Sequence, residues 1–321
     1  MDIKQKNNLT LIALAAFVAV FAFGNYGLGF EQWKIHWWAD MAWTMASLLT
    51  GWKCLQTAKH ERGQYKRAWR FFGAACLAWS LGMLYWDYQE LIQHQVTPFP
   101  AFSDVGFLLF APLFMVGILS YRAEAPTAPI TLKQLCNLGI ILSAISIAVP
   151  VILIGSLKAS TESRLYLAAA LAYPMLYLTA VLFGLTSLWL SVWGVHRKVF
   201  SLILAGVAVH TATNTLYASS LLGHAYETGN YLDVYWIVGF ALIYAAAAKQ
   251  GELGADHAPA SAWDRNPRRS RELENFVSAA MLIMVTTVLY LFADNLQGAI
   301  VHYLFPMAPI IAMTSKASHK P

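Results

Sequence analysis

The fold is decided by FSDVGFLLFAPLFMVGILSY, residues 102–121, a run of 20 residues in which nearly every side chain is apolar. As an α-helix rising about 1.5 Å per residue, this run can cross the roughly 30 Å hydrocarbon core of a bilayer. Apolar stretches of similar length occur on both sides of it, at about 10–30, 35–55, 68–90, 134–157, 165–190, 199–222, 231–249, 275–293 and 297–314. We therefore expect an all-α integral membrane protein with about ten transmembrane helices.

Lysine and arginine are concentrated in every second gap between these stretches. The remaining gaps hold only Lys34, Lys158 and Arg164, so 19 of the 22 basic residues lie on one side of the expected membrane. Basic loops are retained in the cytoplasm during insertion, so this asymmetry predicts an even number of crossings with both termini cytoplasmic. We expect the bacterial inner membrane, with the basic loops in contact with membrane lipids.

The composition excludes an ordinary soluble domain, because 58% of the residues are hydrophobic and only 12% are charged. The net charge of +5 is explained by the basic loops, so no nucleic-acid partner is predicted. Each of the three cysteines maps to the cytoplasmic half of its helix, on the reducing side, which supports neither a disulfide framework nor a metal cluster. We find no nucleophile elbow, HExxH motif or phosphate-binding glycine loop, and hence no catalytic residues.

An internal repeat is suggested by a shift of 129 residues, which places segments one to four on segments five to eight. The best local match pairs Tyr88 with Tyr217 and Asp104-Val105 with Asp233-Val234. Both copies run in the same direction, which predicts a parallel 4+4 repeat, although apolar helices also resemble one another by chance. The predicted domains are an eight-helix membrane bundle (1–250), a basic cytoplasmic linker (251–274) and a two-helix C-terminal membrane hairpin (275–321).

Carboxylates gather on the side opposite to the basic loops. Nine fall there: Glu31, Asp40, Asp87, Glu90, Asp104, Glu162, Glu227, Asp233 and Asp294. His36 and Asp40 are four residues apart, on one helical face, and can pair directly. Asp40 and Asp87 lie deeper in their segments, where an ionisable group is costly and usually faces a partner or a wet cavity.

This side of the protein is the candidate binding site. A cavity lined by carboxylates and aromatic rings suits a cation or an amine-bearing ligand. The candidate ligand-binding residues are His36, Asp40, Trp86, Asp87, Tyr88, Glu90, Asp104 and Asp233. The alternatives are an interfacial aromatic belt and, for Asp104 and Asp233, helix N-capping. A divalent metal on His36, Asp40 and a third ligand is a further alternative, but the spacing has no specific signature, so we assign no metal and leave the cofactor unknown.

His210 lies near the middle of its segment, with Asn214 one turn further on. A proton relay or a haem ligand is one interpretation of such a histidine. An interhelical hydrogen bond within a polar seam is the favoured one, because neither a CxxCH motif nor a well-paired set of mid-membrane histidines accompanies it. We therefore expect His210 and Asn214 to form a polar seam between helices.

Two runs of the sequence resemble a known family. They are AWSLGMLYWDYQEL (78–91) and PFPAFSDVGFLLFAPLFMVGIL (98–119), where the matching positions are Phe99, Pro100, Ser103, Asp104, Phe107 and Pro112. Over roughly residues 65–250 the chain is similar to the multi-pass membrane sensory regions of bacterial GGDEF-type diguanylate cyclases and related sensor kinases. The resemblance implies membrane-embedded signal input. That family often has Asp where Asn214 stands, and this sequence holds no cyclase, phosphodiesterase or kinase output domain.

The expected function is that of a stand-alone sensory module, which binds a small ligand from the periplasmic side, with a cation or an amine as the candidate. Binding would shift helices and alter the basic cytoplasmic segments 53–70 and 251–274, where we expect contact with a protein partner. The alternatives are a transporter or channel for a cation or amine, and a structural or assembly subunit of a membrane complex. An intramembrane enzyme with Asp87 and Asp104 as an acid–base pair ranks last.

Overall fold

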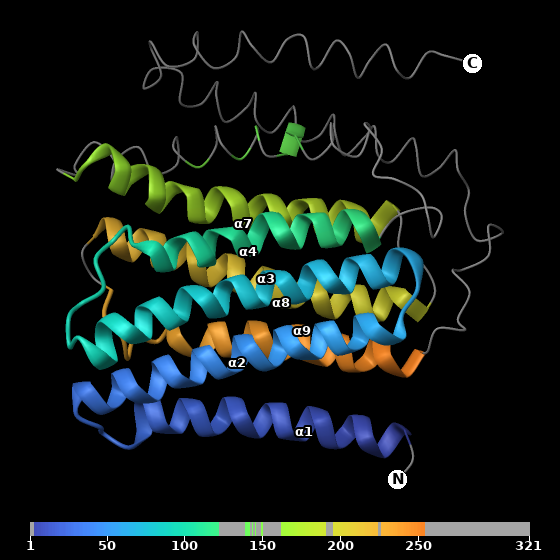
Figure 1. Cartoon of the computed structure of the whole chain (residues 1–321), viewed down its shortest axis with the longest axis horizontal. Coiled ribbons are helices and arrows are strands. Elements are labelled where there is room, and N and C mark those ends of the chain that lie inside the picture. Colours follow the sequence, from blue (N-terminus) through green and yellow to red (C-terminus); the bar gives the residue numbers. More distant parts are fainter. Residues whose placement is uncertain are drawn as a thin grey trace, which may run out of the picture.

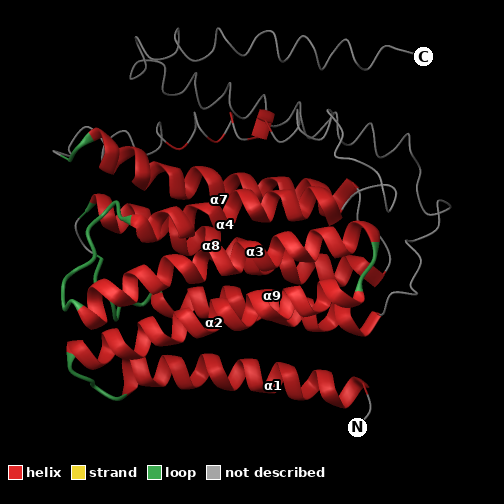
Figure 2. Cartoon of the chain, in the orientation of Figure 1, coloured by secondary structure: helices red, strands yellow, loops and turns green. Residues whose placement is uncertain are grey.

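The computed structural model describes residues 3–121, 162–190, 195–223 and 226–253, with a few isolated positions between 139 and 149. Within these residues every regular element is a helix, which confirms the all-α prediction there (Figure 2). The elements are α1 (Ile3–Ala22), a π-helical turn (Phe23–Gly27), α2 (Gln32–His60), α3 (Gly63–Asp87), a second π-helical turn (Tyr88–Ile92), α4 (Phe102–Tyr121), α7 (Arg164–Leu190), α8 (Val195–Leu222) and α9 (Asp233–Leu253).

The helix boundaries follow the apolar stretches closely but extend beyond them. Helix α4 spans the predicted residues 102–121, whereas α2 continues past residue 55 to His60 and α3 already begins at Gly63. These extra turns carry basic side chains, which an apolar window leaves out although they are good helix formers. The predicted segments 275–293 and 297–314, most of 251–274 and nearly all of 134–157 lie outside the described residues.

Four of the described helical stretches are long and apolar enough to cross a membrane: Leu9–Gly27, Phe102–Tyr121, Arg164–Leu188 and His196–Leu222. Large apolar side chains also remain exposed on the outer surface of the bundle, including Ile12, Leu48, Leu81 and Leu84. Exposed apolar side chains of this size suit contact with lipid. Helices α2, α3 and α9 are similarly long but include more polar residues, so the total of about ten crossings stays a prediction.

The described helices lie alongside one another with their axes roughly aligned (Figure 1). Helix α3 packs against α2 and α4, and α8 packs against α7 and α9. These two groups meet through contacts of α2 with α9 and of α4 with α7, while α1 packs on α9. The α1–α2, α3–α4 and α8–α9 connections all lie at one end, at the left of Figure 1, which we call the carboxylate end.

Helices α2 and α9 run in the same direction, and a row of hydrogen bonds fixes their register. Three donors of α2 reach backbone carbonyls of α9: Trp43 to Asp233 at 3.1 Å, Thr50 to Phe240 at 3.3 Å and Thr57 to Ala247 at 2.9 Å. Donors and acceptors recur every seventh residue, the interval at which one face of a helix returns to the same partner. This register sets the position of the polar residues at the start of α2.

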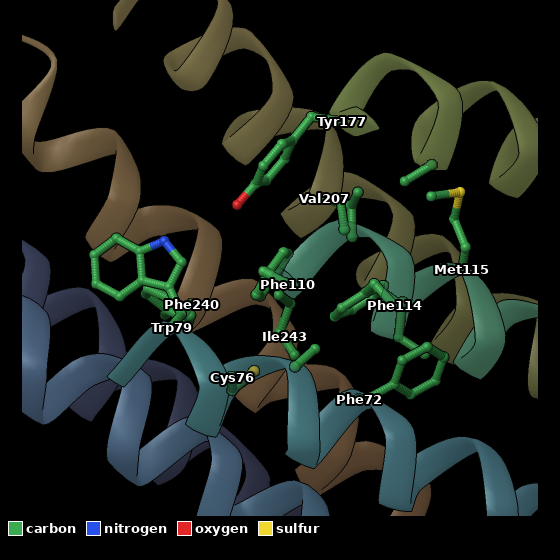
Figure 3. Close-up of a cluster of buried hydrophobic side chains, with 14 of the residues drawn as sticks. Phe72, Cys76, Trp79, Phe110, Phe114, Met115, Tyr177, Val207, Phe240 and Ile243 are labelled. Atoms are coloured by element: carbon green, nitrogen blue, oxygen red, sulfur yellow. The ribbon is translucent and has the colours of Figure 1, made fainter. Parts of the chain in front are cut away.

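The core between the two groups is aromatic (Figure 3). Trp79 of α3 meets Phe240 of α9 edge to face, with ring centroids 5.0 Å apart. Phe110 of α4 stacks on Tyr177 of α7 at 5.7 Å. Such ring contacts add about 0.5–1.5 kcal/mol each beyond the area that they bury. The helices are therefore held at defined distances around a rigid centre.

A hydrogen-bonded chain lies at the end opposite to the carboxylate end. The Tyr121 hydroxyl donates to Gln250 Oε1 at 2.9 Å, and Gln250 Nε2 donates to Glu61 Oε1 at 2.8 Å. All three residues are buried, and burial raises the pKa of Glu61, which lies in the turn between α2 and α3. The chain thus joins that turn to α4 and α9.

Replacing Gln250 by leucine is expected to lower the free energy of unfolding by about 1–3 kcal/mol for each group that loses its partner while buried. Thermal melting of the purified protein in detergent measures this loss. Gln93→Leu is the matched control, because Gln93 donates to the Tyr88 hydroxyl at an exposed position, where a change within about 0.5 kcal/mol is expected. Equal losses in the two variants would contradict a structural role for the buried chain.

Candidate functional site

The candidate site is built on a polar stripe along α2. Its members recur every fourth residue and therefore share one helix face: Gln32, His36, Asp40 and Thr44. Exposure falls along the stripe, from Gln32 at the surface through the partly exposed His36 to Asp40, which is fully buried. The stripe leads from the carboxylate end into the interior.

Side chains from the end of α3 meet this stripe. His36 Nδ1 lies 2.5 Å from Glu90 Oε2. The Thr44 hydroxyl donates to Asp87 Oδ2 at 2.8 Å. Gln32 Nε2 lies 3.1 Å from His36 Nε2, and an amide nitrogen only donates, so Nε2 accepts. The proton of the neutral His36 ring therefore sits on Nδ1 and is donated to Glu90.

Glu90 owes its position to the π-helical turn that follows α3. The Gln93 N–H donates to the Tyr88 carbonyl at 3.0 Å, five residues back along the chain. Such turns are wider than an α-helical turn and are frequent at functional sites. Here the Glu90 side chain contacts His36 and is only 5% exposed.

Asp40 is the most unusual member of the site. The residue is 0% exposed, and neither carboxylate oxygen has a hydrogen-bond partner in the described part of the chain. The carboxylates of Glu90, Asp87 and Asp233 are close enough to repel its charge. Burying a carboxylate without a partner is unfavourable, so Asp40 is the strongest candidate in the site for contact with a bound cation.

Asp104 and Asp233 are held by their own loops instead. Asp104 Oδ2 accepts from the Ala101 N–H at 2.6 Å, immediately before α4, and Oδ1 accepts from the Tyr173 hydroxyl. Asp233 Oδ2 accepts from the Gly229 N–H at 2.7 Å. Gly229 has a φ of +102°, a conformation that glycine adopts without strain. Both carboxylates therefore stabilise helix starts, as in the capping alternative.

The aromatic candidates divide between the interior and the surface. Trp86 lines a cavity of about 30 Å³ together with Trp43 and Tyr226, among other rings, which is room for one or two water molecules. Tyr226 also donates to Asp233 Oδ1 at 3.2 Å, so this cavity adjoins the carboxylates. Tyr88 is 49% exposed and accepts from Gln93, as an interfacial tyrosine would.

His210 lies in the aromatic core rather than at the site. Its ring is 4.5 Å from Phe240 and 5.0 Å from Phe110 between centroids, and neither ring nitrogen has a hydrogen-bond partner among the described residues. Asn214 Nδ2 donates to the His210 carbonyl within the same helix. Among the described residues, neither His210 nor Asn214 makes the interhelical hydrogen bond predicted for them. A bond of this kind is made one residue further on by Thr211, which donates to the Tyr177 carbonyl at 3.1 Å.

Among the described residues, no lysine or arginine neutralises the site. In the described residues Lys34 forms an ion pair with Glu31 at 3.5 Å, and no lysine or arginine pairs with Asp40, Asp87 or Glu90. A hydrogen bond from Trp33, followed by the charge of Lys34, lowers the pKa of the exposed Glu31. The site is therefore a concentration of negative charge that favours cations.

Sequence reasoning finds part of this arrangement. Four of the predicted candidates lie together in the structure, namely His36, Asp40, Asp87 and Glu90. The carboxylate of Asp104 instead accepts a hydrogen bond from Tyr173. Gln32 and Thr44 were missed, although their four-residue spacing from His36 and Asp40 is a readable signal. Tyr173 lies 69 residues from Asp104 along the chain, and no local pattern predicts that contact. Comparisons with protein-family models, with curated proteins and with solved structures found no match, so function is inferred from the geometry of the site.

Proposed function

We propose that this chain is a receptor-like membrane module that binds a small cation at His36, Asp40, Asp87 and Glu90. The observation that carries the proposal is Asp40, which is fully buried, has no hydrogen-bond partner among the described residues, and lies beside the carboxylates of Glu90, Asp87 and Asp233. A cation satisfies these groups directly, and no lysine or arginine among the described residues forms an ion pair with them. The partly exposed His36 provides a route of entry.

The membrane arrangement that we propose has about ten crossings in a bacterial inner membrane, with both termini in the cytoplasm and the carboxylate end on the periplasmic side. The four long apolar helices and the exposed apolar surface support insertion. The distribution of the basic residues supports this orientation. The resemblance of residues 65–250 to the sensory regions of diguanylate cyclases and sensor kinases agrees with a receptor role.

The proposed parallel 4+4 repeat is supported by matched local contacts. Asp104 and Asp233, which are 129 residues apart, each accept from a backbone N–H that precedes their helix and from a tyrosine hydroxyl. Tyr121 and Gln250, also 129 residues apart, bond to each other at the opposite end. In such a repeat α2 corresponds to α7, and α4 corresponds to α9. The contact of α2 with α9 is therefore equivalent to the contact of α7 with α4.

Signal transmission would pass along α2 and α3. His36 and Asp40 belong to α2, Asp87 ends α3, and the same two helices join at the basic segment 53–70. Between these ends Gly51 and Gly73 bring the backbones together, since a Cβ at either position would lie 3.2 Å from the carbonyl oxygen of the other. If a bound cation draws α2 and α3 together at the site, the two helices would tilt about this contact and move segment 53–70. This segment and 251–274 are the proposed contacts with a protein partner.

The Gly51–Gly73 contact also favours a receptor over a channel between these two helices, because it leaves no space for an ion to pass there. Transport by another route is the alternative, and flux of the bound cation in proteoliposomes would identify it. A structural or assembly subunit would instead co-purify with other chains at fixed stoichiometry. An acid–base pair of Asp87 and Asp104 is disfavoured, because Thr44 and Tyr173 hold these carboxylates separately.

The receptor proposal predicts a response at segment 53–70 when a cation binds. In nanodiscs, one of Zn²⁺, Ca²⁺, putrescine or choline is expected to stabilise the protein and to change hydrogen exchange in this segment. Asp87→Asn should weaken the apparent affinity by about a hundredfold, since a unit charge several ångströms away contributes about 2–4 kcal/mol at an effective dielectric of 20.

Asp104→Asn is the control for this experiment, because its carboxylate is occupied by Tyr173 and the Ala101 N–H, and it should keep the wild-type affinity. An unchanged affinity in Asp87→Asn would contradict the site. Binding without any change in hydrogen exchange of 53–70 would contradict the signalling role.

A further inference from the structure

The geometry points to a divalent transition-metal site formed by His36, Asp40 and Glu90, so that the cation of the proposed function is a metal ion. One ligand atom from each of the three residues lies within 4.8 Å of the other two. Ligand atoms around a tetrahedral zinc ion are roughly 3.3 Å apart. Small side-chain rotations therefore suffice to close the three residues around one ion.

Asp40 supplies evidence for a ligand that is independent of the clustering. Its carboxylate is one of the three converging groups, it is fully buried, and both oxygens lack a hydrogen-bond partner in the described chain. An acidic residue that merely lines a solvated surface would be exposed or hydrogen-bonded. A metal ion bound between the three residues would coordinate one carboxylate oxygen of Asp40 and so give that oxygen a partner.

The donor set selects the kind of cation. Two carboxylates and one neutral imidazole provide two negative charges, which match a divalent ion. Imidazole suits zinc and its neighbours among the transition metals, whereas calcium and magnesium are held by oxygen atoms alone. An ammonium group would pair with the carboxylates but could donate only a single hydrogen bond to His36. The mixed nitrogen and oxygen set therefore favours a metal over an amine.

The surroundings of His36 fit this role. Gln32 lies against Nε2 of the ring and also donates to the Thr228 carbonyl at 2.7 Å. If Nδ1 held the ion, the ring proton would reside on Nε2, and Gln32 would accept it by turning its amide oxygen toward the ring, giving up its bond to the Thr228 carbonyl. Gln32 is thus a positioning residue of the kind that orients metal-bound histidines. His36 is 24% exposed, which leaves a coordination position for water.

The test uses the full chain without a histidine tag, purified in detergent, stripped with a chelator and titrated with Zn²⁺ and Co²⁺. We expect one ion per chain and, for Co²⁺, the visible absorption bands of a low-symmetry nitrogen and oxygen site. Asp40→Asn and His36→Gln should each weaken Zn²⁺ binding by about a hundredfold or more, and Gln32→Leu by about tenfold. Asp104→Asn should bind like the wild type.

The outcomes separate this inference from the proposed function. Binding of putrescine or choline that depends on Asp40 and Asp87, without Zn²⁺ binding, would overturn the metal site and leave a cation receptor. Zn²⁺ binding that is unchanged in both Asp40→Asn and His36→Gln would overturn the assignment of ligands. Failure of the wild-type protein to bind any of these cations would overturn the metal site and the receptor together.

Discussion

Gly106→Leu is expected to prevent α3 and α4 from packing, with a loss of stability above the usual 1–3 kcal/mol for an overpacked core. A Cβ at residue 106 would lie 2.4 Å from the Ala78 carbonyl oxygen and 2.8 Å from the Gly82 nitrogen. Both are backbone atoms of α3 and cannot rotate away. The two helices would have to separate, which breaks the contacts between Trp79 and Phe107.

The variant should give little monodisperse protein after extraction, and any folded fraction should melt well below the wild type. Gly251→Leu is the matched control, because Gly251 also lies in a helix and no atom from elsewhere in the described part of the chain lies within 4 Å of its Cβ position. Leucine there is expected to be neutral or mildly stabilising, as leucine favours helix more than glycine does. Wild-type melting of Gly106→Leu would show that the helices pack differently.

The helices could be predicted from the sequence because their apolar runs are long. Residues 102–121 are the clearest example, since length and hydropathy together define both ends of α4. The polar face of α2 is also readable, as His36 and Asp40 are four residues apart. Both features depend only on residues close together in the sequence, so the pattern of apolar and polar residues is enough to predict them.

Contacts between helices could not be predicted, because they depend on register and on local distortions of the backbone. Glu90 reaches His36 from within a π-helical turn, which an apolar run ending near residue 90 does not reveal. Cys54 and Cys76 are isolated in the sequence, yet their thiols meet across the α2–α3 interface. Within the described residues, the same register leaves Asp40 without a hydrogen-bond partner, while each carboxylate oxygen of Asp233 accepts one hydrogen bond.

Because Asp40 and Asp233 differ in this way, substitutions of these two aspartates are expected to change the free energy of unfolding in opposite directions. In protein stripped of cations, Asp40→Leu is expected to raise the free energy of unfolding by about 1–3 kcal/mol, since a buried group without a hydrogen bond is replaced by an apolar one of similar size. The melting temperature should rise by several degrees, and the stabilisation by added Zn²⁺ should disappear. These results would show that the wild-type Asp40 supports cation binding at the expense of stability.

Asp233→Leu should do the reverse, because the Gly229 N–H and the Tyr226 hydroxyl lose the carboxylate that accepts from them. A loss of up to about 1–3 kcal/mol is expected for each donor left unpaired, since both hydrogen bonds are part-buried. Melting curves of both variants, recorded with chelator and again with Zn²⁺, separate a binding carboxylate from a structural one. Destabilisation of the chelated protein by Asp40→Leu would mean that Asp40 already has a partner within the chain, and the case for a bound cation would fail with it.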